Sequence, residues 1–244
     1  MGRKVKEQNK IGQAMGNKGR DTRRRIIDQT MLLLRTTPYI ELSAADVARA
    51  CNLTPPALYL YFKGIPEIVL ARLDEIKGLH HRFMDIVERP WPPDTAVSMA
   101  EAFMASYVHY WTEFGVALRY RNFMSEQGDE RFRRARTEMS FPLADSFAQR
   151  IVAAQKQGIT PKHLDRYAAA GAILALAEHV AGTVNAHLGK WNGQYLAERD
   201  MLNASAYMIV SLLHGPRTPE FLAEVAKPVK RKRASSQESI ATID

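Results

Sequence analysis

Between residues 43 and 63 the sequence gathers side chains that suit binding to phosphate. Ser43, Tyr59 and Tyr61 carry hydroxyl groups, and Lys63 carries an ammonium group. Both kinds of group donate hydrogen bonds to phosphate oxygens, and such contacts fix the register of a protein on DNA without reading its sequence. Helix caps, half-buried packing tyrosines and a solvated lysine would give the same residue types. The residues alone therefore leave both interpretations open.

Positive charge is concentrated at the two ends of the chain. Residues 1–63 carry a net charge of +7, residues 64–226 carry −2, and residues 227–244 carry +3. A near-neutral body with basic ends favours a polyanionic partner, although solvated tails would give the same pattern. The basic residues placed to contact a DNA backbone or minor groove are Lys18, Arg20, Arg23, Arg24 and Arg25.

Two short capped helices are expected to position the hydroxyl groups. Ser43 stands where an N-cap is expected, with Asp46 three residues later as in a capping box. Thr54 is the next cap, and Pro55 and Pro56 follow in the first helical turn, where a missing N–H costs little. Two such helices joined by a tight turn predict a helix-turn-helix, whose second helix enters the major groove in DNA-binding proteins.

This stretch resembles the DNA-binding signature of the TetR family of transcriptional regulators. The matching segments are Ser43-Ala44-Ala45-Asp46-Val47-Ala48, Asn52-Leu53-Thr54 and Leu58-Tyr59-Leu60-Tyr61-Phe62-Lys63. The sequence departs from the family pattern at Pro56 and Ala57, and again in the segment Gly64-Ile65-Pro66-Glu67.

The resemblance implies a homodimeric repressor that binds a palindromic, double-stranded DNA operator and is released by a small-molecule effector. It implies phosphate contacts from Ser43, Tyr59, Tyr61 and Lys63. It implies that Thr54, Pro55, Pro56 and Leu60 face the groove, and we add Arg20 and Arg23 as contacts from the N-terminal arm. Because the proline pair offers neither backbone donors nor long polar side chains, we expect few direct hydrogen bonds to bases and more readout through thymine methyl groups and DNA shape.

The whole chain is expected to be all-α. We expect a disordered basic arm at residues 1–19, a DNA-binding domain at 20–65, a ligand-binding and dimerisation domain at 66–214, and a basic, disordered tail at 215–244. The helices expected in the second domain span 66–87, 94–114, a shorter stretch between Gly115 and Gly128, 129–157, 161–188 and 196–213. The helix at 129–157 is expected to kink or break at Phe141-Pro142, and residues 189–193 are expected to form a loop.

Small residues line the helix expected from Pro161. Ala168–Ala170, Gly171, Ala172 and Ala175 belong to this set, and the last helix adds Ala204 and Ala206. Small side chains let helices approach closely, as at a two-fold four-helix interface, and the resemblance favours homodimerisation. A core packed within one chain is the alternative.

An aromatic stripe follows the helix expected from Asp94. It predicts an apolar pocket with a few polar groups, although an aromatic stripe in plain core would look the same. The scarcity of polar residues on the stripe favours a lipophilic effector, such as a fatty acyl or polycyclic compound. The candidate ligand-binding residues are Phe103, Tyr107, Tyr110, Trp111, Phe123, His179 and Thr183.

Motifs of common enzymes and metal sites are missing from the sequence. It contains no GxGxxG, Walker, GxSxG or HExxH pattern, and the adjacent His80 and His81 diverge on a helix. The single cysteine, Cys51, cannot form an internal disulfide and fits a small buried position. We expect no enzymatic activity, no cofactor and no metal.

The weakly polar stretch 167–188 holds Glu178, His179, Asn185 and His187, so we expect no membrane span. Because the single cysteine rules out an internal disulfide, a reducing cytoplasm is the expected location. The alternative to a regulator is a helical ligand-binding or scaffold protein whose basic ends contact RNA or a membrane.

Overall fold

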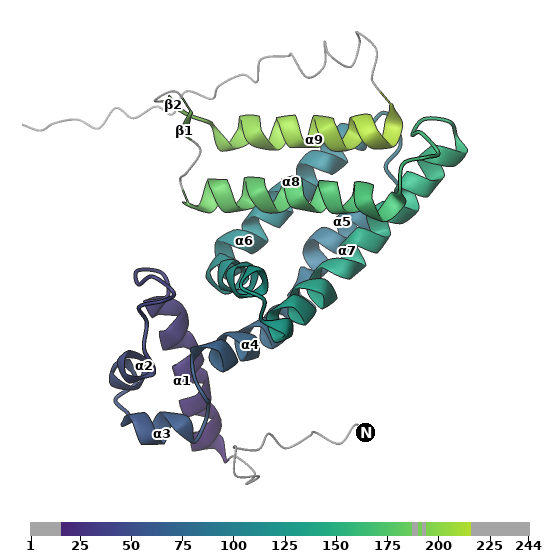
Figure 1. The fold of residues 1–244 in the computed structure, drawn as a ribbon. Coiled ribbons are helices and arrows are strands. Elements are labelled where there is room, and N and C mark those ends of the chain that lie inside the picture. Colours follow the sequence, from purple (N-terminus) through teal and green to yellow (C-terminus); the bar gives the residue numbers. More distant parts are fainter. Residues whose placement is uncertain (1–15, 187–189, 192–193, 216–244) are drawn as a thin grey trace, which may run out of the picture.

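The computed structural model describes residues 16–186, 190–191 and 194–215. Within them the regular secondary structure is helical apart from one pair of two-residue strands. Three helices form a small unit at one end of the molecule: α1 (Asn17–Leu33), α2 (Ala44–Ala50) and α3 (Pro55–Tyr59) (Figure 1). The all-α prediction is confirmed. The expected arm and tail lie mostly outside the described residues, and α1 begins at Asn17, before the expected start at Arg20.

The small unit is built around a compact apolar core. The side chains that fill it come from all three helices and from the turn after α3, and all are at most 2% exposed: Ile26, Ile27, Val47, Ala48, Leu58 and Phe62. Leu58 and Phe62, which are four residues apart, both belong to this core. Burial of these side chains fixes α3 against α1 and α2, and so fixes the surface that α3 presents to solvent.

The helix expected over 66–87 is divided in the structure. It consists of α4 (Ile65–Ile76), a 3₁₀ turn η1 (Lys77–His80) and α5 (His81–Glu88). Gly78 lies in the 3₁₀ turn, and glycine weakens an α-helix because it loses most backbone freedom on folding. A short non-helical segment follows α5, and in it Trp91 Nε1 donates to the Ile86 carbonyl at 2.9 Å.

Long helices make up the larger unit: α6 (Ala96–Glu126), α7 (Glu130–Lys156), α8 (Arg166–Ala186) and α9 (Glu198–His214) (Figure 1). The strands β1 (Lys190–Trp191) and β2 (Gln194–Tyr195) pair antiparallel between α8 and α9, partly within the expected loop. Helix α8 starts at Arg166, later than expected, because Asp165 Oδ1 accepts hydrogen bonds from the backbone N–H groups of Tyr167 (2.9 Å) and Ala168 (2.8 Å).

One expected helix boundary in this unit is wrong, and the break that was one of two alternatives at Pro142 does not occur. Gly115 does not end a helix, because α6 continues through it with Trp111 and Arg119 packed beside it. Pro142 lies inside α7, whose assignment is unbroken from Glu130 to Lys156.

Helix α8 is long and apolar enough, by length and composition alone, to cross a membrane. In the structure it packs against α6, α7 and α9, and these contacts bury one side of α8.

Candidate DNA-binding surface and effector cavity

The two caps of the helix-turn-helix form as the sequence predicts. Ser43 Oγ accepts a hydrogen bond from the Asp46 N–H at 3.2 Å, and Asp46 Oδ2 accepts one from the Ser43 N–H at 3.1 Å. Hydrogen bonds from Ser43 lower the pKa of the Asp46 carboxyl, so it stays ionised at the start of α2. Thr54 Oγ1 accepts from the Ala57 N–H at 3.3 Å and caps α3.

The tight turn between α2 and α3 depends on Asn52. Its φ of +52° lies in the left-handed region, which asparagine tolerates better than most residues. The next N–H, that of Leu53, returns to the Ala48 carbonyl at 2.9 Å. This backbone conformation sets the angle at which α3 leaves α2.

Helix α3 exposes the face expected to meet DNA. Thr54, Pro55 and Pro56 are exposed, and the side chains of Tyr59 and Leu60 are each 48% exposed. None of these five exposed residues is charged, and we call them together the α3 face. It contains no long polar side chain apart from the Tyr59 phenol, as expected from the proline pair.

The remaining expected phosphate contacts have different surroundings. Ser43 is exposed, but its hydroxyl group takes part in the α2 cap. Tyr61 is half-buried against the core, and Lys63 is exposed while its backbone N–H donates to the Glu67 carboxylate. Of the four, Tyr59 and Lys63 are exposed and their side chains take no part in a helix cap.

Arg20 and Arg23, which were expected to contact DNA from the N-terminal arm, lie within helix α1. Arg20 is exposed, and Arg23 is half-buried with its guanidinium carbon 5.0 Å from the centre of the Phe62 ring. Because Phe62 lies three residues after the end of α3, this contact brings the Arg23 charge close to the α3 segment.

Replacing Arg20 and Arg23 by glutamine should flatten the salt dependence of DNA binding. In a plot of the logarithm of the binding constant against the logarithm of the salt concentration, removal of each phosphate-binding charge should make the negative slope shallower by about 0.9. Fluorescence anisotropy with labelled DNA at several salt concentrations measures this slope. Arg82→Gln, on α5, is the control that removes an arginine outside the small unit, and a slope equal to wild type in the double variant would refute the α1 contacts.

Most of the candidate ligand-binding aromatics lie in packed core. The Phe83 ring contacts the rings of Phe103, Tyr107 and Tyr110 at centroid distances of 6.5, 5.2 and 5.3 Å. Burial raises the pKa of the Tyr107 phenol and raises that of Tyr110 to about 12. These phenols therefore remain protonated at neutral pH.

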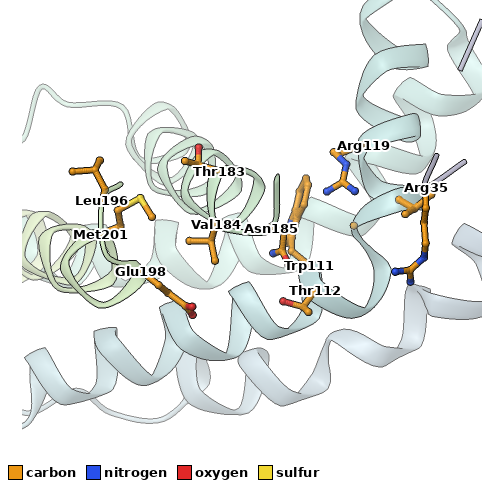
Figure 2. Close-up of a pocket in the computed structure, with 12 residues that line it drawn as sticks. Arg35, Trp111, Thr112, Arg119, Thr183, Val184, Asn185, Leu196, Glu198 and Met201 are labelled. Carbon is orange, nitrogen blue, oxygen red and sulfur yellow. The ribbon is translucent and has the colours of Figure 1, made fainter. Parts of the chain in front are cut away.

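The other four candidates are spread over different surroundings. Phe123 packs against Tyr39 at 5.6 Å, and His179 is exposed on α8. Trp111 and Thr183 line a cavity of about 710 Å³ between α6 and the ends of α8 and α9 (Figure 2). Of the seven candidate residues, the structure brings only these two together in this cavity.

The cavity also contains residues that the sequence did not single out. It is lined by Arg35, Thr112, Gly115, Val116, Arg119, Val184, Asn185, Leu196, Glu198 and Met201 in addition to Trp111 and Thr183. These residues are far apart in the sequence, and no spacing pattern connects them. Their proximity follows only from the way in which the helices pack.

A buried ion pair lies beside the aromatic core. Arg121 Nη2 donates to Glu178 Oε1 at 2.9 Å, and the two side chains are only 4% and 14% exposed. Arg136 Nη2 also lies 3.3 Å from Glu178 Oε2. Within the part of the chain that the structure describes, no group of three His, Cys, Asp or Glu residues is placed to hold a metal ion.

The small residues of α8 divide between core and surface. Ala169, Ala170 and Ala177 are buried against the bundle. The opposite side of α8 is exposed at Ala168, Gly171, Ala172, Ala175 and His179, and α9 is exposed at Ala204 and Met208. We call these exposed residues the α8–α9 face.

Two family models match the chain. The model described as "Bacterial regulatory proteins, tetR family" matches residues 26–71, and "Tetracyclin repressor-like, C-terminal domain" matches residues 84–212. The first match covers most of the small unit together with the first part of α4, and the second covers most of α5–α9. A search of curated proteins found no match.

Solved structures with a similar fold include three regulators. The MbdR regulator from Azoarcus sp. CIB is 17% identical, with 81% of this chain and 100% of that chain covered and a TM-score of 0.58. AibR in complex with isovaleryl coenzyme A and operator DNA is 14% identical (80% and 100% covered, TM-score 0.57). FadR from Bacillus subtilis in complex with stearoyl-CoA is 17% identical (80% and 99% covered, TM-score 0.53). At these identities the likeness concerns the fold.

Proposed function

The chain belongs to the TetR family of transcriptional regulators, and we propose that it is a repressor that binds a palindromic operator as a homodimer. The observation that carries this proposal is the exposed α3 face, held by a capped and tightly turned helix-turn-helix. In this proposal residues 20–65 bind DNA, residues 66–214 bind the effector and dimerise, and the protein acts in the cytoplasm.

The α8–α9 face supports homodimerisation. Its small side chains allow two helices of one protomer to approach the same helices of a partner closely, and the exposed Met208 (58%) adds apolar area. A two-fold dimer presents two α3 faces in inverted orientation, and this arrangement matches a palindromic DNA site.

A lipophilic effector is proposed to release the operator. The cavity beside Trp111 and Thr183 offers a volume in the range of small-molecule sites. Two of the structural relatives carry acyl-coenzyme A compounds, and one of these was solved with its operator. These relatives support an acyl compound as the class of effector to test first.

A gel-shift assay with the DNA upstream of the protein's own gene tests the proposal. In moderate salt with nonspecific competitor DNA, the protein should give a discrete shift that depends on one inverted repeat. Addition of an acyl-coenzyme A series should reverse this shift. A shift that is competed equally by random DNA, or no shift at all, would contradict the operator-binding proposal.

A further inference from the structure

The cavity is bounded by both functional units of the protein. Arg35 comes from the segment between α1 and α2, whereas Trp111 and Arg119 come from α6 and Thr183 from α8 (Figure 2). In Figure 2 the two arginines lie at the same end of the cavity. A ligand at this end would therefore touch the small unit and the helical bundle together.

Arg119 has a donor without a partner at this end. Its Nη1 atom is buried and makes no hydrogen bond within the described part of the chain. The group lies close to α6 because Gly115 has no side chain: a Cβ atom there would lie 3.0 Å from Nη1. A buried, charged donor without an acceptor is costly. Because Arg119 also lines the cavity, a small rotation of its guanidinium group would bring this donor to a ligand oxygen, and the new hydrogen bond would remove that cost.

Arg35 adds a second positive charge. Its side chain is exposed, and among the described residues no carboxylate lies within ion-pair distance of either Arg35 or Arg119. The segment that carries Arg35 is held to α6 by Tyr39, whose ring contacts Tyr120 at 5.2 Å. Arg35 is thus tethered to the bundle by a packed contact four residues away.

The other end of the cavity has a different character. Val184, Leu196 and Met201 provide apolar surface there, and Glu198 provides the one carboxylate of the lining (Figure 2). Glu198 would repel an anionic group from this end, while the arginines would attract it to the opposite end. The cavity therefore favours one orientation of an amphipathic anion.

We propose that the cavity binds an organic anion, with its carboxylate, sulfonate or phosphate on Arg119 and Arg35 and its apolar body against Val184, Leu196 and Met201. This assignment deepens the proposed function, on which it rests, by giving the effector a charge and an orientation. Because Arg35 belongs to the DNA-binding unit, an anion on both arginines would tie the position of that unit to occupancy of the cavity.

Two fluorescent probes test the assignment directly on the full-length protein. 8-Anilinonaphthalene-1-sulfonate carries an anionic group on an apolar body, and N-phenyl-1-naphthylamine has the same apolar body without the sulfonate. We expect Arg119→Gln to weaken sulfonate binding roughly tenfold or more, as for loss of a charge-assisted hydrogen bond, and Arg35→Gln to weaken it roughly two- to fivefold. Binding of the neutral probe should stay within about twofold of wild type in both variants.

Controls separate charge from folding. Arg89→Gln removes an exposed arginine outside the cavity lining and should leave both probes unaffected. Arg119→Lys keeps the charge without the planar fork, and should fall between wild type and Arg119→Gln. Three outcomes would overturn the assignment. Wild type and Arg119→Gln would bind the sulfonate with equal affinity, the variant would lose affinity for both probes equally, or wild type would show no saturable binding of the sulfonate. The titration uses no DNA, so its failure is distinct from a failed operator shift.

Discussion

Replacing Glu178 by alanine is expected to lower the free energy of unfolding by about 3–5 kcal/mol. The substitution leaves Arg121, whose side chain is 4% exposed, without the carboxylate to which its Nη2 donates at 2.9 Å. Glu178 also accepts from Asn122 at 3.4 Å and pairs with Arg136. An uncompensated buried guanidinium charge is the cause of the expected loss. Urea denaturation followed by circular dichroism measures it.

Two comparisons separate the buried charge from general damage to the helices. Glu138→Ala breaks the exposed pair with Lys77, whose side chains are 47% and 45% exposed, and should cost less than about 1 kcal/mol. The double variant Arg121→Met with Glu178→Leu removes both buried charges, and should be more stable than Glu178→Ala. If Glu178→Ala costs no more than Glu138→Ala, the buried pair does not stabilise the bundle as proposed.

Local signals explain why the helix-turn-helix could be predicted from the sequence. The cap of α2 depends on Ser43 and Asp46, which are three residues apart, and the cap of α3 on Thr54 and the N–H of Ala57. Such contacts are set by neighbours in the chain, so residue type and spacing are sufficient to find them.

Packing between distant segments explains what the sequence did not show. Gly115 looked like a helix end, but α6 continues through it, and Arg119 occupies the space that a side chain at Gly115 would need. The aromatic stripe of Phe103 and Tyr107 predicted a pocket, but Phe83 from α5 fills the space beside it. A periodic pattern shows which face of a helix is apolar, and does not show whether another element or a ligand covers that face.

The residues of the cavity likewise could not be found from patterns in the sequence. Arg35 and Arg119 are 84 positions apart in the numbering, and nothing in either local sequence marks it as part of a binding site. The two arginines line the same cavity because the segment after α1 packs against α6, where the Tyr39 ring contacts the Tyr120 ring. The anionic character of the proposed ligand could therefore be inferred only from the three-dimensional arrangement.

Replacing Leu60 by glutamate is expected to reduce operator affinity at least about 100-fold, because it puts a negative charge on the face proposed to enter the groove. Leu60 is 48% exposed and follows α3 directly, so the carboxylate would remain in solvent in the free protein. The thermal midpoint of unfolding should stay close to that of wild type. Fluorescence anisotropy with the operator found by gel shift measures the decrease in affinity.

The same substitution elsewhere in the small unit provides the control. Ile40 is 84% exposed, and its neighbour Tyr39 packs against α6 of the larger unit. Ile40→Glu adds the same charge away from the α3 face, and at 0.15 M salt, where the screening length is about 8 Å, it should weaken DNA binding less than about fivefold. If the two variants lose affinity equally, net charge and not the α3 face controls binding. If only Leu60→Glu loses affinity, the carboxylate acts at the DNA contact itself, as the exposed α3 face requires.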